Sequence, residues 1–98
     1  MRRIHYGDVC AAARALMRVE TGAQSGLCLR MIRQAQTAEA HRRETGRPHP
    51  LWGTGSLMEV ARCHPLAAEP GFENPDYCAA MRLVLGCLMQ QALSQRRT

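Results

Sequence analysis

Residues 74–95 read NPDYCAAMRLVLGCLMQQALSQ, and this stretch decides the fold. Asn74 is a favoured N-cap, Pro75 suits the first helical position, and Asp76 complements the positive end of the helix dipole. The apolar residues that follow recur at helical spacing, which predicts a core side made of Tyr77, Met81, Val84, Leu85, Leu88, Met89 and Ala92. We therefore expect a helix to about residue 95 at the centre of the fold. Gly86 inside it suggests a close helix crossing.

Two further helices are expected before this one. Asp8 as N-cap and Gly22 as left-handed C-cap predict a helix over about residues 8–20. An apolar stripe from Cys28 to Ala38 predicts a second helix over about residues 24–44, and Gly46 then ends it. Both helices carry arginine on the face opposite their apolar residues.

A short third helix is expected through about Cys63, because Ser56 and Glu59 have the spacing of a capping box. The composition agrees with helices throughout: fourteen Ala, ten Leu and six Met stand against one Trp, one Phe and two Tyr. The predicted fold class is all-α, a compact bundle of about four helices with a Pro/Gly-rich loop before the short one. Its 98 residues are expected to form a single helical domain over 1–98.

The charge of the chain is basic and uneven. All thirteen basic residues are arginine, so lysine-dependent chemistry such as a Schiff base is excluded. Residues 1–47 carry the whole formal net charge of +5, whereas residues 48–98 are neutral. A basic half is compatible with an acidic protein or with nucleic acid and does not choose between them.

The five cysteines do not form an evident disulfide framework, and no zinc spacing is present. Cys10, Cys28 and Cys87 lie among apolar neighbours, where a thiol behaves as a small buried side chain. Reduced thiols fit the cytoplasm, and no run approaches the roughly 20 apolar residues that span a bilayer. We expect a cytoplasmic protein that holds no metal or cofactor and does not span a membrane.

The segment RPHPLWGTGS, residues 47–56, is the most specialised part of the chain. Its prolines and glycines rule out regular structure. Two readings stay open for its tryptophan: packing in the core, or an exposed anchor for a partner. A third reading places an anion on the amides of residues 53–56. The predicted partner-binding residues are Arg47, His49, Trp52, Gly53, Gly55 and Ser56.

This segment and its neighbours, HRRETGRPHPLWGTGSLM over residues 41–58, resemble small uncharacterised proteins of alphaproteobacteria. The resemblance extends over most of the chain, from Gly7-Asp-Val to Asn74-Pro-Asp-Tyr. It implies a compact family of unknown function and brings no activity, cofactor or partner with it.

No Ser, Cys or carboxylate pair stands in a catalytic motif, so we expect no enzyme. The preferred interpretation is a non-enzymatic interaction or regulatory module that docks on an unidentified protein. The alternative is a small nucleic-acid-binding protein whose first two helices resemble a helix-turn-helix, although the expected turn is long for that motif. Self-association into a homodimer is compatible with both. The predicted contacts of the alternative are Arg14, Arg18, Arg30 and Arg33.

Overall fold

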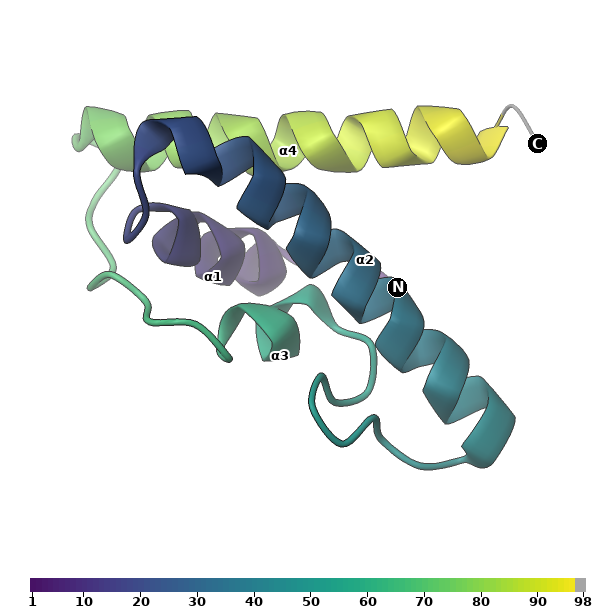
Figure 1. Ribbon diagram of the computed structural model, residues 1–98. Coiled ribbons are helices and arrows are strands. Elements are labelled where there is room, and N and C mark those ends of the chain that lie inside the picture. Colours follow the sequence, from purple (N-terminus) through teal and green to yellow (C-terminus); the bar gives the residue numbers. More distant parts are fainter. Residues whose placement is uncertain (97–98) are drawn as a thin grey trace.

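A computed structural model describes residues 1–96 as an all-α bundle of four helices (Figure 1). The helices are α1 (Tyr6–Leu16), α2 (Thr21–Thr45), α3 (Leu57–Ala61) and α4 (Pro75–Arg96). Within these residues there is no strand, only an isolated bridge in the loop before α3. The predicted fold class is therefore confirmed. No helix of the described part is long and apolar enough to cross a membrane.

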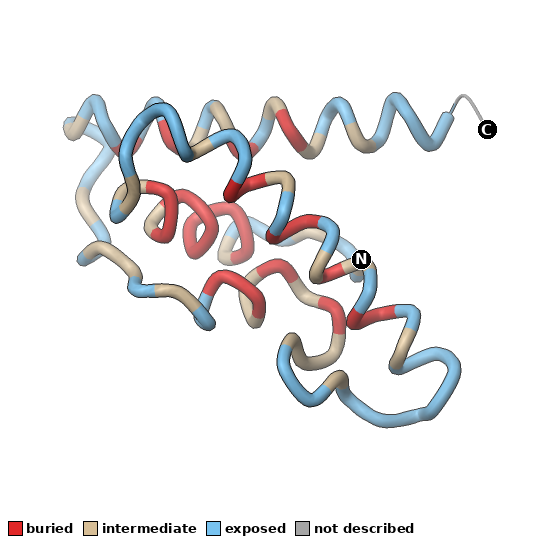
Figure 2. Tube along the Cα trace, in the orientation of Figure 1, coloured by how far each residue is buried: buried red, intermediate tan, exposed pale blue. Residues whose placement is uncertain are grey.

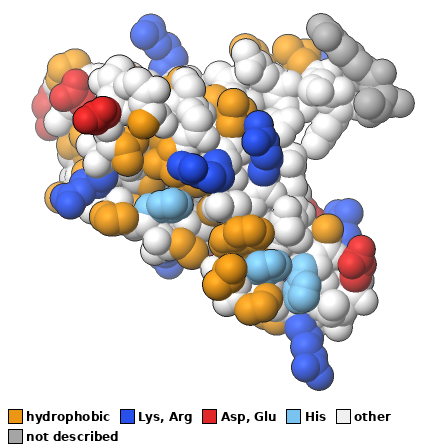
Figure 3. Space-filling view, viewed as in Figure 1, with side chains coloured by type: hydrophobic (Ala, Val, Ile, Leu, Met, Phe, Trp, Pro, Cys, Tyr) orange, Lys and Arg blue, Asp and Glu red, His pale blue; other side chains and the backbone are white. Residues whose placement is uncertain are grey.

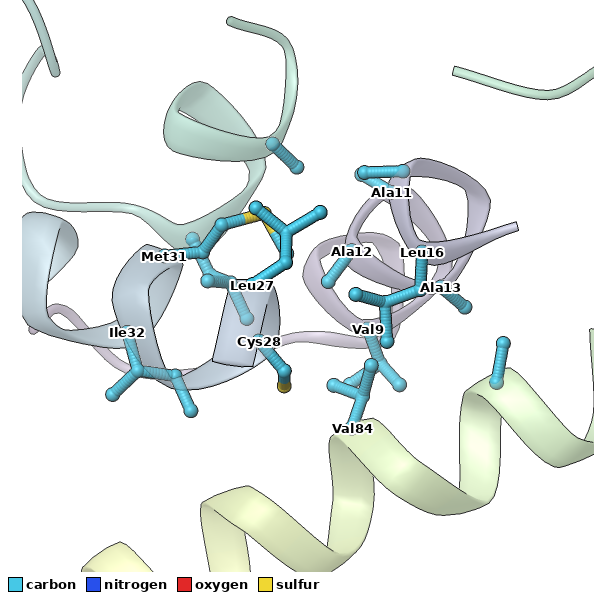
Figure 4. Packing of buried hydrophobic residues seen from close by; sticks show 14 of the residues in the cluster. Val9, Ala11, Ala12, Ala13, Leu16, Leu27, Cys28, Met31, Ile32 and Val84 are labelled. Carbon is cyan, nitrogen blue, oxygen red and sulfur yellow. The ribbon is translucent and has the colours of Figure 1, made fainter. Parts of the chain in front are cut away.

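The shortest of the three main helices, α1, forms the centre of the bundle (Figure 2). Eight of its eleven residues are buried, and four of these are alanines. Their short side chains let the other helices approach: Figure 4 shows α1 beside Leu27 and Met31 of α2 and beside Val84 of α4. The prediction that α4 is central was wrong.

The longer α4 buries only four of its 22 residues, Tyr77, Ala80, Val84 and Cys87. Three residues predicted for its core side, Leu85, Met89 and Ala92, are instead exposed. Gly86 does not mark a crossing, because a Cβ built there would meet no atom within 4 Å. Only one narrow side of α4 is covered by the bundle.

The start of α1 differs from the prediction. His5 is the N-cap, and Asp8 lies one turn into the helix, where its Oδ2 accepts a hydrogen bond from the backbone N–H of His5 at 2.8 Å. Its Oδ1 accepts another from the N–H of Met58 at 2.9 Å. One buried carboxylate thus holds the first turns of α1 and α3 together, which explains why an acidic residue occupies this place.

The remaining helix ends follow the sequence more closely. Gly46 has φ 73° and ends α2, Ser56 accepts from the N–H of Glu59 and begins α3, and Asn74 accepts from the N–H of Asp76 and begins α4. Gly22 is an exception, since it lies in the first turn of α2 rather than after α1. The connection between α1 and α2 is therefore only residues 17–20.

Candidate partner-binding loop

Residues 46–56 connect α2 to α3 at the end of the molecule away from the start of α4 (Figure 1). Two backbone hydrogen bonds close the tip of this loop: His49 N–H donates to Gly53 O at 2.7 Å, and Gly53 N–H donates to His49 O at 3.1 Å. Gly53 has φ 78°, in the left-handed region that favours glycine. The tip is therefore a closed turn over residues 49–53.

The His49 side chain reinforces this turn from inside. Its Nδ1 accepts hydrogen bonds from the backbone N–H groups of Leu51, at 3.0 Å, and Trp52, at 3.3 Å. Its ring stacks on Trp52 with centroids 4.6 Å apart and planes 9° from parallel. The His41 ring, from α2, meets the ring of His49 edge-on at 5.2 Å. These contacts give the loop tip a defined shape and attach it to α2.

The second half of the loop is held by Glu59 of α3. Its carboxylate accepts hydrogen bonds from the backbone N–H and hydroxyl of Thr54 and from the hydroxyl of Ser56. Burial acts to raise the pKa of Glu59, but the hydrogen bonds from Thr54 and Ser56 and the charge of Arg2 outweigh it, so the pKa lies below its usual value. The carboxylate thus occupies the N–H of Thr54, one of the amides that the anion reading would use.

Gly55 brings the loop against the side of α2. A Cβ at this position would lie 2.6 Å from the Cβ of Glu39 and 2.9 Å from its Cα, and φ is 105°. Glu39 is itself buried and pairs with the N-terminal ammonium group and with Arg43, at 2.9 Å. Gly55 is thus required for packing and offers no surface to a partner.

The six predicted partner-binding residues fall into three groups. Gly53, Gly55 and Ser56 shape the loop from within, whereas Arg47 is exposed. His49 and Trp52 are half-buried, and Trp52 packs against the edge of the core, while its use as an anchor for a partner stays a prediction. The sequence reasoning missed the most exposed apolar residue of the loop, Leu51, whose accessible fraction is 69 %. The feature of the sequence that could have pointed to Leu51 is its position beside Trp52 in the Pro-Leu-Trp-Gly turn.

Apolar side chains gather next to a pair of histidines at this end of the molecule (Figure 3). The apolar part of this surface comes from Leu51, the exposed Pro50 and the uncovered part of Trp52. Arg47 lies four residues before Leu51 and is also exposed. We call this group of four residues the loop surface.

The four arginines predicted for nucleic acid lie in different surroundings. Arg14 is half-buried, and its Nε donates to Ala67 O at 2.7 Å, so it anchors the segment that follows α3. Arg18 lies in the α1–α2 connection rather than on a helix, and Arg30 and Arg33 are exposed on α2. The α1–α2 connection has four residues, 17–20, a length that a helix-turn-helix allows.

The cysteines behave as small apolar or surface side chains. Cys10, Cys28 and Cys87 are buried, and Cys63 and Cys78 are exposed, all as free thiols. Burial raises the pKa of Cys28 to about 12, and the neighbouring Cys87 adds to the effect, which makes a reactive thiolate unfavourable there. Within residues 1–96, no three His, Cys, Asp or Glu side chains come close enough together to hold a metal ion.

Comparison with known proteins assigns the chain to a family. The model of a domain of unknown function, DUF7742, matches residues 2–96, and the chain belongs to this family. No curated protein and no solved structure matches it.

Proposed function

We propose that this member of the DUF7742 family is a non-enzymatic interaction module that docks on a protein partner through the loop surface. The observation that carries the proposal is the exposure of Leu51, 69 %, on a turn that two backbone hydrogen bonds between His49 and Gly53 close. Together with Pro50 and the uncovered part of Trp52, Leu51 forms an apolar patch, and such a patch beside a charged residue is typical of a protein-binding surface. The five free thiols fit a reducing compartment, so we place this function in the cytoplasm.

The rigidity of the turn supports this proposal. Binding costs free energy whenever a loop must be ordered, and a loop that is already ordered avoids that cost. Here the backbone bridge, the Nδ1 atom of His49 and the stacked Trp52 ring order the tip before any partner arrives. Leu51 would then enter an apolar pocket of the partner, and Arg47 would pair with an acidic residue at the rim of that pocket.

The distribution of charge indicates an acidic partner. Among residues 1–96, eleven arginines are exposed against five carboxylates, since Asp8, Glu39 and Glu59 serve internal contacts. Four of the five exposed carboxylates lie in the α1–α2 connection or in residues 69–76, at the end opposite the loop (Figures 1 and 3). The loop end is thus the more basic one, and it would steer an acidic partner towards Leu51.

Site-specific photo-crosslinking in cells tests the proposal. A benzophenone amino acid at position 51 should give a crosslinked adduct with a defined protein, and the Arg47→Glu change should reduce its yield. The matched control carries the benzophenone at the exposed Ala68, far from the loop in sequence. Equal adducts from positions 51 and 68, or none from position 51, would remove the loop as the docking site.

Nucleic-acid binding is the second candidate, and the excess of exposed arginine favours it. It would use Arg18, Arg30 and Arg33, since Arg14 is engaged with Ala67. Affinity for duplex DNA or RNA should then fall steeply with salt, because bound counterions are released. Titration of labelled duplexes at about 50 mM salt decides this, and a failure to bind there excludes the candidate.

A further inference from the structure

The outer side of α4 carries an apolar stripe that the bundle does not cover. Leu85, Met89 and Leu93 are 54 %, 61 % and 46 % exposed. They are four residues apart, so they follow one another along a single face of the helix. Figures 1 and 2 show this half of α4 running past the other helices with mostly exposed residues. A soluble domain rarely leaves such a continuous apolar surface without use.

A groove lies beside this stripe. An open hollow of about 520 Å³ separates the first half of α2 from α4, with Ser25 and Leu29 on one wall and Leu83, Gly86 and Gln90 on the other. A second hollow, of about 460 Å³, begins at the exposed Phe72. The two hollows share Ala79 and Arg82 of α4. Stripe and groove together form one surface, which we call the α4 surface.

The dimensions of the α4 surface suit a helix. From residue 75 to residue 93 it extends over about 27 Å, the length of roughly five helical turns. Gly86 lies in the middle, and a Cβ there would meet nothing within 4 Å, so a second backbone can approach closely at this point. Apolar residues four apart are the pattern that an amphipathic helix recognises.

The charge of the α4 surface decides between possible occupants. The carboxylates of this surface, Glu73 and Asp76, lie at its Phe72 end only, and residues 77–96 contain no Asp or Glu. Arg82, which belongs to both hollows, forms no ion pair among the described residues. In an antiparallel pair of α4 helices centred on Met89, Arg82 of one copy would face Arg96 of the other. A parallel pair would bring two Arg82 side chains together. Like charges make self-association unfavourable, whereas carboxylates on a different helix would pair with Arg82.

We propose that the α4 surface binds an amphipathic helix of a second protein whose apolar stripe is flanked by carboxylates. Its apolar side chains would cover Leu85, Met89 and Leu93 and enter the groove beside Gly86. A carboxylate would reach Arg82. This site is independent of the loop surface, so either can fail without the other.

Two synthetic helical peptides test the inference. Both carry leucine at helical spacing over 18 residues. One has glutamate beside the leucines and the other has lysine at the same positions. We expect saturable binding of the acidic peptide in fluorescence anisotropy, with amide chemical-shift changes in α4 and the first half of α2. The lysine peptide should bind at least about tenfold more weakly.

Charge reversal identifies the contact. Arg82→Glu should lower the affinity for the acidic peptide by about three- to tenfold and raise the affinity for the lysine peptide. Met89→Ser should lower the affinity for both peptides. Arg62→Glu is the matched control, because Arg62 is also exposed but lies after α3. Folding of each variant is checked by circular dichroism.

Three results would overturn the proposal. The first is equal binding of the two peptides, and the second is an Arg62→Glu effect as large as that of Arg82→Glu. The third is a dimer of the free protein in light scattering that Met89→Ser dissociates, because the α4 surface would then belong to a second copy.

Discussion

The two sides of this bundle use helices in opposite ways. On the inner side, the eleven-residue α1 buries eight residues and packs against the other three helices. On the outer side, the 22-residue α4 buries four residues and leaves the apolar stripe of Leu85, Met89 and Leu93 exposed to water. The comparison teaches that the helix with the longest apolar stripe need not be the core of the fold. Small side chains that allow close packing on several sides made α1 the centre instead.

Truncating one leucine on each side should give the largest contrast. Leu16→Ala removes a fully buried side chain of α1 and should lower the free energy of unfolding by about 3 kcal/mol. Leu85→Ala, at a half-exposed position of α4, should change it by less than about 1 kcal/mol. Urea unfolding of both variants measures the difference. Equal losses would mean that the outer side of α4 is covered.

Replacing glycine by alanine should lower the stability of the fold at position 55 and raise it at position 86. Gly55→Ala places a methyl group against Glu39 at a positive φ and should destabilise by about 2 kcal/mol. Gly86→Ala meets open space in a helix and should stabilise by up to about 1 kcal/mol. Thermal unfolding should therefore move in opposite directions. A loss of stability in Gly86→Ala would show that the groove is narrower than described.

The loop repeats this comparison at a smaller scale, with Trp52 on its inner side and Leu51 on its outer side. Trp52→Ala removes the ring that stacks on His49 and packs on the core, and should cost about 1.5 kcal/mol. Leu51→Ala should cost less than about 0.5 kcal/mol, because Leu51 is exposed. Denaturant midpoints test both, and the reverse order would place Leu51 inside the fold.

The smallest expected effect depends on pH. The pKa of Glu59 is lower in the folded protein than its ordinary value, so its contribution to stability is present above that ordinary value and is lost as the pH falls through the folded pKa. At pH 7, Glu59→Gln should cost about 1 kcal/mol. The gap between wild type and variant should close on acidification below about pH 4. A gap that is constant with pH would mean that the charge of Glu59 contributes nothing.

Part of the candidate site could be predicted and part could not. The turn residues of the loop and the exposure of Arg47 follow from the sequence, since proline and glycine act on their own backbone. The exposure of Leu51 could not be predicted, because it depends on His49 turning its ring inwards and on Trp52 taking the place beside the core. The apolar stripe of α4 was visible in the sequence, but the fraction of it that the bundle covers was not.

The sequence by itself determined the four helices and most of their ends. Asn74, Ser56 and Gly46 act on amides or carbonyls within a few positions of themselves, so their effect can be read locally. Only the tertiary structure decided that Asp8 binds Met58, that Gly55 meets Glu39, and that α1 is central. Helical spacing shows that a face is apolar, but burial depends on neighbours that lie far away along the chain.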